Sequence, residues 1–168
     1  MALFILFGLP GAGKTFVGDI FKKYVNFYFY DGDNELPKEI KQAIKNQAKI
    51  TDTMRDVFFQ KLIKKVQKLK SQHENIVIAQ TFIKEKYRKM LLKKIKEASF
   101  ILIQTDTPIR ESRLRNRKDY PLDMEYARNM VLNFEKPSLH HQLILNNKNG
   151  ENQIKKQIAL ILTKYPYR

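Results

Sequence analysis

The sequence of 168 residues contains no cysteine. This absence excludes a disulfide scaffold, a cysteine-ligated zinc site, a thiolate nucleophile and an iron–sulfur cluster. The sequence also lacks an apolar run of the roughly 18–20 residues that a membrane-spanning helix needs, so we expect no membrane contact. The apolar run at Ala2–Phe7 is too short for a signal peptide and has no basic flank. Together these absences favour a protein of the cytoplasm.

Acidic residues are scarce relative to basic ones, with 17 Asp and Glu against 32 Lys and Arg. The net charge is +15 and the pI is about 9.9, and a pI above about 9 is typical of nucleic-acid-binding domains. The excess consists mainly of lysine, with 24 Lys and only 8 Arg, and lysine also covers ordinary solvated helix faces. Nucleic acid therefore stays an open partner that the composition does not favour.

Apolar periodicity predicts strands and helices in alternation. We expect strands at Leu3–Phe7, Phe27–Tyr30, Asn75–Ala79, Phe100–Gln104 and Gln142–Leu145. We expect helices at Gly13–Tyr24, Lys38–Asn46, Thr53–Lys70, Lys84–Lys96, Thr107–Arg117, Asp123–Glu135 and Asn152–Tyr165. Such alternation is typical of βαβ units, so we predict an α/β fold in three αβα layers with a five-stranded parallel sheet. At this length the chain is expected to form a single domain over residues 1–168.

The residues after the first expected strand match the phosphate-loop pattern G-x-x-x-x-G-K-[ST] in full. They are Gly8, Leu9, Pro10, Gly11, Ala12, Gly13, Lys14 and Thr15. Glycines let the backbone wrap closely around a phosphate, so that successive N–H groups face the anion. Lys14 is expected to reach the β- and γ-phosphates of ATP, and the Thr15 hydroxyl is a candidate Mg²⁺ ligand. The motif predicts nucleotide binding but does not by itself define the reaction.

Two carboxylates, Asp31 and Asp33, follow the second expected strand. In a parallel sheet the C-terminal ends of the strands meet at one edge, where ligands bind. One carboxylate can hold Mg²⁺ through water while the other accepts the proton of an attacking hydroxyl. An Asp-Gly-Asp segment is also an ordinary turn sequence, and the upstream phosphate loop is what favours the functional interpretation.

Four later segments occur in the order found in P-loop small-molecule kinases. They are Thr51–Arg55 (TDTMR), Thr81–Arg88 (TFIKEKYR), Glu111–Arg117 (ESRLRNR) and Phe134–Pro137 (FEKP). Together with the phosphate loop and the aspartate pair, they resemble gluconokinase most and shikimate kinase next. The resemblance spans roughly residues 3–165. It implies the P-loop nucleoside-triphosphate-hydrolase fold of the small-kinase type, with a short helical lid at about residues 113–135.

The resemblance also implies roles on the acceptor side. Asp33 would bind the acceptor and act as a base or orienting group, whereas Asp31 would lie nearer the metal. Arg55, Lys84 and Arg88 would face an anionic acceptor that carries a hydroxyl group.

On the donor side, the resemblance implies ATP as cofactor with Mg²⁺. Arg113 and Arg117 lie four residues apart on one face of an expected helix, so both would border the lid at the nucleotide. Arg117 would stabilise charge on the transferring phosphoryl group. The catalytic residues would then be Lys14, Asp33 and Arg117.

The sequence departs from the family at positions that shape the acceptor pocket and the lid. Leu36 stands where the family has histidine, Gln80 where it has a small residue or cysteine, and Phe82 where it has alanine. The lid reads Asp119-Tyr120-Pro121 in place of Gly-His-Phe. These changes predict a smaller or less polar pocket, and they leave the identity of the acceptor open.

Three functional hypotheses follow. The first is an ATP- and Mg²⁺-dependent kinase that phosphorylates a hydroxyl of a small polar metabolite, of the gluconate or sugar-acid kind, as a monomer or homodimer. The second replaces the metabolite by a nucleotide or a polynucleotide 5′-hydroxyl, which the lysine excess motivates and which predicts steep salt dependence. The third is a nucleotide-binding regulator without catalysis, which the altered lid motivates.

Overall fold

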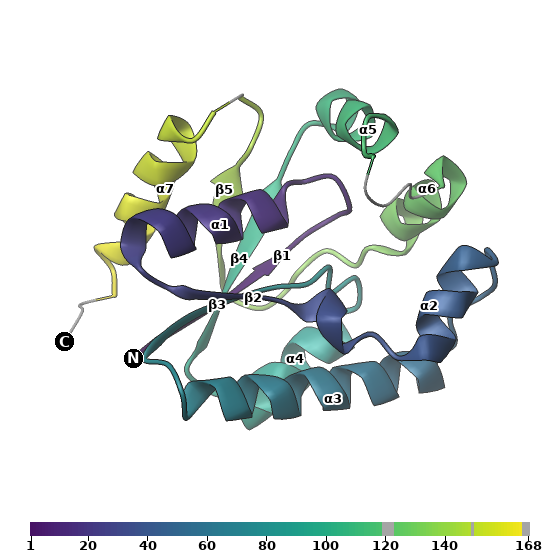
Figure 1. Ribbon diagram of the computed structural model, residues 1–168, viewed down its shortest axis with the longest axis horizontal. Helices are drawn as coiled ribbons and strands as arrows, with labels where there is room; N and C mark the ends of the chain where they lie inside the picture. Colours follow the sequence, from purple (N-terminus) through teal and green to yellow (C-terminus); the bar gives the residue numbers. More distant parts are fainter. Residues whose placement is uncertain (119–122, 149, 166–168) are drawn as a thin grey trace.

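The computed structural model describes residues 1–118, 123–148 and 150–165, and a five-stranded sheet lies at its centre (Figure 1). The strands are β1 (Ala2–Phe7), β2 (Tyr28–Asp31), β3 (Asn75–Ala79), β4 (Ala98–Gln104) and β5 (His141–Leu145). Their order is β2-β3-β1-β4-β5, and every neighbouring pair is parallel. The predicted five-stranded parallel sheet is confirmed, with each strand boundary within two residues of its expected position.

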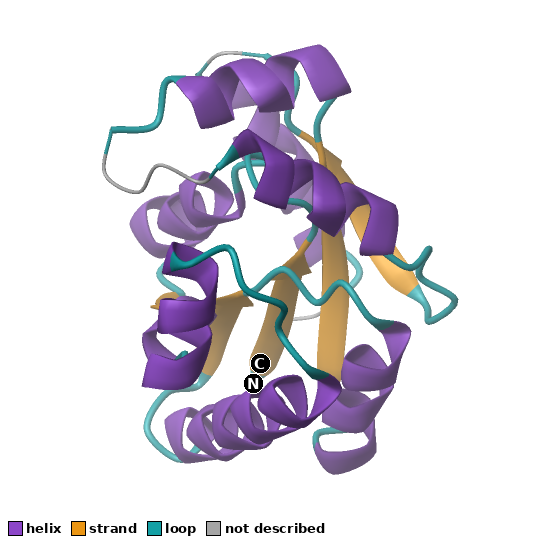
Figure 2. Cartoon of the chain, turned by 90° about the vertical axis from the view of Figure 1, so that its right-hand side faces the viewer, coloured by secondary structure: helices purple, strands orange, loops and turns teal. Residues whose placement is uncertain are grey.

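Helices cover both faces of the sheet, as the αβα prediction requires. They are α1 (Lys14–Val25), α2 (Lys38–Lys45), α3 (Asp52–Lys70), α4 (Glu85–Lys94), α5 (Thr107–Arg115), α6 (Met124–Asn133) and α7 (Asn152–Leu162), with a 3-10 turn η1 (Gly32–Glu35). α1 and α7 pack on one face, and α3 and α4 pack on the other. α2, α5 and α6 gather at the end that carries the loop from β1 to α1, and Figure 2 looks onto that end. Within the described residues, no helix is both long enough and apolar enough to cross a bilayer.

β1 is apolar along its length because both of its faces are buried. Phe4 and Leu6 face the core under α1 and α7, whereas Leu3, Ile5 and Phe7 face the core under α3 and α4. The central strand of a sheet covered on both sides takes apolar residues at successive positions. This burial anchors β1 in the middle of the sheet, so the loop that follows it emerges at the centre of the C-terminal edge.

α5 ends two residues earlier than the apolar spacing predicts. Its last residue is Arg115, and Asn116 caps it with φ −88° and ψ 0°. The Arg117 N–H then donates to the Leu114 carbonyl at 3.3 Å, in a turn that lies beyond the helix. α4, α6 and α7 are shortened by two or three residues at the same end. Spacing alone does not mark a helix terminus, because the terminal turn depends on local capping bonds.

One side chain forms hydrogen bonds with both backbone groups of the last residue of the edge strand β5. The Leu145 N–H donates to Gln157 Oε1 at 2.8 Å, and Gln157 Nε2 donates to the Leu145 carbonyl at 2.9 Å. Gln157 lies on α7, so a helix that packs on the sheet also satisfies these outer backbone groups. Unpaired edge groups would otherwise be a template for strand addition.

Candidate active site

The phosphate loop joins β1 to α1 and wraps around the N-terminus of the helix. Gly8, Gly11 and Gly13 have φ angles of +144°, +81° and +90°, which residues with a side chain rarely adopt. At Gly13 there is also no room, since a Cβ would lie 2.2 Å from Asn146 Nδ2. The backbone N–H groups at the start of α1 are therefore available to a phosphate, as the motif predicts.

A buried hydrogen-bond network supports the loop. The Ala12 carbonyl accepts from Asn146 Nδ2 at 2.8 Å and from Thr105 Oγ1 at 3.0 Å. Because the C=O and N–H of a trans peptide point in opposite directions, holding the Ala12 carbonyl aims the Gly13 N–H to the other side. Sequence reasoning missed Thr105 and Asn146. Their position in the sequence could have indicated them, because each residue directly follows a strand at the edge where ligands bind.

Two arginines of α5 also contact the loop region. Arg113 donates to the Asn146 carbonyl at 2.9 Å and to Thr105 Oγ1 at 3.3 Å. Arg110, which sequence reasoning did not single out, is 4% exposed and donates to the Pro10 carbonyl at 3.4 Å. Arg113 therefore lies beside the phosphate loop with part of its hydrogen-bonding capacity already used, and its contact with nucleotide stays a prediction.

Lys14 folds back onto the loop. Its Nζ donates to the Gly8 carbonyl at 2.9 Å and to the Leu9 carbonyl at 3.0 Å. Burial lowers the pKa of the Lys14 ammonium to about 8, although the nearby Asp33 and Asp31 carboxylates raise it. The charges of Arg117 and Arg110 lower it further. Near pH 7 the group still carries its proton, so it is a cation held by two neutral carbonyls.

This pKa predicts how ATP affinity changes with pH. Triphosphate oxygens near Lys14 favour the protonated ammonium, so above pH 8 binding must take up a proton. We expect the dissociation constant of ATP to be nearly constant from pH 7 to 8, and then to rise by up to about tenfold per pH unit. Titration calorimetry from pH 7 to 9.5 measures this. A Lys14→Arg variant, which does not titrate in this range, should give a flat profile, and a flat wild-type profile would contradict the assignment.

Asp31 and Asp33 lie at the same end of the sheet as the phosphate loop. Asp31 ends β2 and caps η1, where its Oδ1 accepts from the Asp33 N–H at 2.9 Å. Burial raises the pKa of the Asp31 carboxyl. The Asp33 N–H lowers it, the Asp33 charge raises it, and Lys14 and Arg117 lower it. Asp33 Oδ1 accepts from Gln80 Nε2 at 3.0 Å. The C-terminal ends of β1 and β2, with β3 between them, therefore bring the two carboxylates and Lys14 to the same edge of the sheet, as expected for a parallel sheet.

Arg117 does not share a helix face with Arg113, because α5 ends before it. This corrects the helical spacing that the sequence suggested. Its charge nevertheless lowers the pKa of both Lys14 and Asp31, and its contact with the transferring phosphoryl group stays a prediction.

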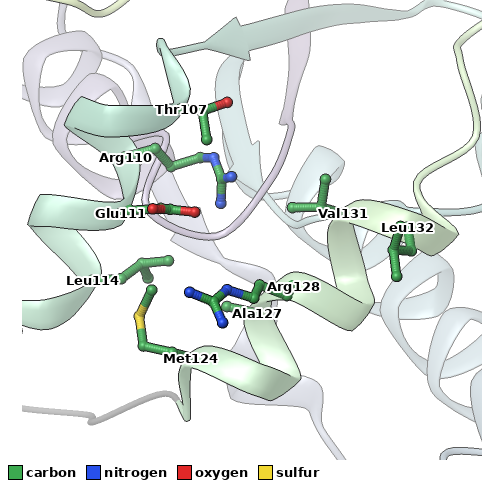
Figure 3. A pocket seen from close by; sticks show the side chains of 9 residues that line it. All are labelled: Thr107, Arg110, Glu111, Leu114, Met124, Ala127, Arg128, Val131 and Leu132. Carbon is green, nitrogen blue, oxygen red and sulfur yellow. The ribbon is translucent and has the colours of Figure 1, made fainter.

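A cavity of about 310 Å³ separates α5 from α6, the helices on either side of the predicted lid tip (Figure 3). It is lined by Thr107, Arg110, Glu111, Leu114, Met124, Ala127, Arg128, Val131 and Leu132. Arg110 connects the cavity wall to the phosphate loop through the Pro10 carbonyl. The predicted lid tip, Asp119-Tyr120-Pro121, lies outside the described residues.

Two of the predicted acceptor-side cations are accessible. Arg55 lies in the first turn of α3, with a side chain 22% exposed and an ion pair to Asp52 at 3.4 Å. Lys84 precedes α4, with a side chain 28% exposed and an ion pair to Glu135 at 3.3 Å. Both ion pairs are long and partly solvated, so they contribute little stability and leave the two cations available to an anion.

Arg88 does not face an acceptor pocket, which corrects the expectation from the family resemblance. Its side chain is 0% exposed, with Nε donating to the Phe82 carbonyl at 2.8 Å and NH1 donating to Glu85 Oε2 at 2.7 Å. The guanidinium carbon lies 5.0 Å from the centre of the Phe7 ring and 4.9 Å from that of Phe134. Arg88 is therefore a structural residue that links the end of β1 to the segment after α6.

Glu85 completes this link. Its Oε1 accepts from the Ser138 N–H at 3.1 Å, the Ser138 hydroxyl at 2.7 Å and the Leu139 N–H at 2.9 Å. Burial acts to raise the pKa of the Glu85 carboxyl, but the hydrogen bonds from Ser138, Arg88 and Leu139 outweigh it and hold the pKa below its ordinary value. The chain that returns from α6 is thus fastened to the start of α4.

Phe82 belongs to the core and not to the acceptor pocket. It is 1% exposed, adopts φ +49°, and packs its ring against Phe59 and Phe100 at centroid distances of 4.9 and 5.6 Å. The prediction that Phe82 narrows the pocket is therefore wrong. Leu36 packs half-buried against the edge of the same core.

Residues 5–147 match the sequence profile of a family described as AAA domain. The chain belongs to this family. The match includes the phosphate loop, the aspartate pair and every predicted cation of the site, and it ends just after β5. Family membership accounts for the P-loop architecture around Lys14 and extends over most of the chain.

The relatives of the chain are small-metabolite kinases. It is 29% identical over 90 residues to a protein called probable gluconokinase from Xenopus tropicalis, which covers 54% of this chain and 47% of that protein. It is 36% identical over 74 residues to a shikimate kinase from Prochlorococcus marinus, covering 44% and 36%. The matched segments thus span less than half the length of these two relatives.

A solved structure of a gluconokinase from Sinorhizobium meliloti 1021 superposes with a TM-score of 0.78. The alignment covers 97% of this chain and 94% of that one at 16% identity. At this identity the likeness shows the fold alone, and it confirms the predicted α/β fold with a parallel sheet.

Proposed function

We propose that this protein is an ATP- and Mg²⁺-dependent kinase that transfers the γ-phosphoryl group to a hydroxyl of a small polar metabolite, of the sugar-acid kind. The proposal is supported by the position of Lys14, Asp31 and Asp33 at one end of the sheet, where the charge of Arg117 also acts. A cation on a phosphate loop, a carboxylate pair and a further arginine are the parts that phosphoryl transfer uses for positioning and charge stabilisation. We propose that residues 1–168 act as one such domain, in the cytoplasm, as a monomer or homodimer.

On the donor side, Lys14 leaves the Gly8 and Leu9 carbonyls and contacts the β- and γ-phosphates, while the N–H groups at the start of α1 hold the phosphate oxygens. Arg113 borders the nucleotide. Arg117 balances the charge that spreads over the transferring group.

Thr15 and Asp31 are the residues that would hold Mg²⁺. A hydroxyl and a carboxylate are the oxygen donors that this ion prefers. Burial raises the pKa of the Asp31 carboxyl, and a divalent cation beside it would stabilise its charged form. Bound there, Mg²⁺ supplies neutralisation of the triphosphate charge.

On the acceptor side, Asp33 receives the hydroxyl, and the accessible Arg55 and Lys84 attract an anionic group of the same molecule. A sugar acid offers both groups at once. This combination favours a metabolite with a hydroxyl and a carboxylate over a neutral alcohol.

An ADP-release assay tests the proposal against its alternatives. The wild-type protein is given ATP and Mg²⁺ with gluconate, other sugar acids, shikimate, nucleosides, nucleotides and 5′-hydroxyl oligonucleotides, each at two salt concentrations. We expect turnover with a sugar acid and weak salt dependence. Turnover only with oligonucleotides, falling steeply with salt, would favour a polynucleotide kinase. Tight ATP binding without turnover on any acceptor would favour a regulator.

A further inference from the structure

Gln80 connects the donor side of the site to the acceptor side. It directly follows β3, the strand that lies between β1 and β2, and it is 7% exposed. Its Nε2 donates to Asp33 Oδ1 at 3.0 Å, and its Oε1 accepts from the Thr81 N–H at 2.7 Å. The Thr81 carbonyl accepts from the Gly8 N–H at 3.3 Å. A continuous path of contacts therefore runs from the first glycine of the phosphate loop to Asp33.

The orientation of the Gln80 amide follows from its partners. A backbone N–H only donates, so the end of the amide that meets Thr81 is the oxygen. The NH₂ end then faces Asp33, whose ionised carboxylate only accepts. Gly32 makes room for this arrangement, because a Cβ there would lie 2.9 Å from the Ala79 carbonyl and 3.2 Å from Gln80 Nε2.

The hydrogen bond from Gln80 involves only one of the two carboxylate oxygens of Asp33. Oδ1 accepts from Gln80, whereas Oδ2 has no hydrogen bond or ion pair within residues 1–118, 123–148 and 150–165. An unassisted carboxylate on an exposed 3-10 turn would rotate about its χ angles. The buried amide restricts that rotation, since it is itself held by the Thr81 N–H.

We propose that Gln80 is a positioning residue that holds the Asp33 carboxylate at a set distance from the phosphate loop, with Oδ2 left for the acceptor hydroxyl. The inference rests on the proposed kinase function. In the transfer step, the acceptor oxygen bonds to the γ-phosphorus and the bond from that phosphorus to the β–γ bridging oxygen breaks. The hydroxyl proton passes to Asp33 Oδ2, and ADP leaves with the bridging electron pair.

Gln80→Met tests the proposal, because methionine keeps the length of the side chain but cannot donate. We expect kcat to fall about 10- to 100-fold, with the dissociation constant of ATP unchanged within twofold. Gln80→Glu should reduce kcat further, since its carboxylate repels Asp33 instead of donating to it. Gln60→Met on the exposed face of α3 is the matched control and should match the wild type. Unchanged kcat in Gln80→Met would overturn the proposal.

A double-mutant cycle separates positioning from general damage to the fold. In an Asp33→Asn background, Gln80→Met should have little further effect on the residual rate, whereas additive losses would overturn the proposal. A readout independent of turnover is the NMR resonance of the Gln80 side-chain amide, which should move in Asp33→Asn and stay in Gln60→Met. An unmoved resonance would show that the contact is absent. A wild type that turns over no acceptor, but shows the resonance change, would overturn the kinase proposal and not the contact.

Discussion

Replacing Lys14 with methionine is expected to reduce phosphoryl transfer at least about 100-fold and to weaken ATP binding. Lys14 is partly buried in the phosphate loop, where its ammonium is held by the Gly8 and Leu9 carbonyls and is free to exchange them for phosphate oxygens. Methionine has a similar length but no charge, so the triphosphate loses its main protein cation in a site of low dielectric. Steady-state ADP release and calorimetric titration with ATP measure the two effects separately.

Lys22→Met is the matched control for this experiment. Lys22 lies on the exposed side of the same helix and away from the loop, so its removal should leave both rate and affinity unchanged. Equal losses in the two variants would mean that overall charge matters and not the position of Lys14. Full activity of Lys14→Met would exclude the phosphate loop as the donor site.

Glu85→Ala is expected to lower the free energy of unfolding by about 3 kcal/mol, more than any surface substitution should. The change removes the partner of Arg88, whose side chain is 0% exposed, and leaves a buried guanidinium without its carboxylate. It also removes three hydrogen bonds to Ser138 and Leu139. Denaturant unfolding at pH 7 measures the effect. Glu39→Ala, in the first turn of α2 as Glu85 is in the first turn of α4, is the control.

The same residue predicts a pH dependence of stability. The folded-state pKa of Glu85 lies below its ordinary value, so the unfolded chain takes up the proton first as the pH falls. Its stabilisation is therefore present above about pH 5 and is lost as the pH drops through the ordinary glutamate range and below. The difference in unfolding free energy between wild type and Glu85→Ala should shrink on acidification. A difference that stays constant to pH 3 would contradict the proposed role of the ionised carboxylate.

The fold and the phosphate loop were predictable because they depend on local patterns. Apolar periodicity predicts β1 and its neighbours, and the glycine spacing around Lys14 is typical of one backbone conformation, the phosphate loop. The acceptor half was less predictable, because its geometry depends on contacts between distant segments. Arg88 fits a family motif by position, yet Phe7, Glu85 and Phe134 enclose it.

The predictions for Phe82 and for the end of α5 were also wrong for physical reasons. The left-handed backbone of Phe82 turns its ring into the core, and no residue spacing signals such a conformation. The end of α5 at Arg115 follows from the capping geometry of Asn116, which apolar spacing does not register. The contact between Gln80 and Asp33 was not predictable from local patterns, because the two residues lie 47 positions apart in the chain.

The side-chain amide of Gln157 limits how the sheet can be extended at the end of β5. The amide accepts from the Leu145 N–H and donates to the Leu145 carbonyl, as the backbone of a neighbouring strand would do. A neighbouring chain that tried to extend the sheet here would first have to displace a bidentate contact. The exposed Leu143 and Leu145 side chains therefore border a sheet edge whose last backbone groups are already hydrogen-bonded, which disfavours strand addition at that point.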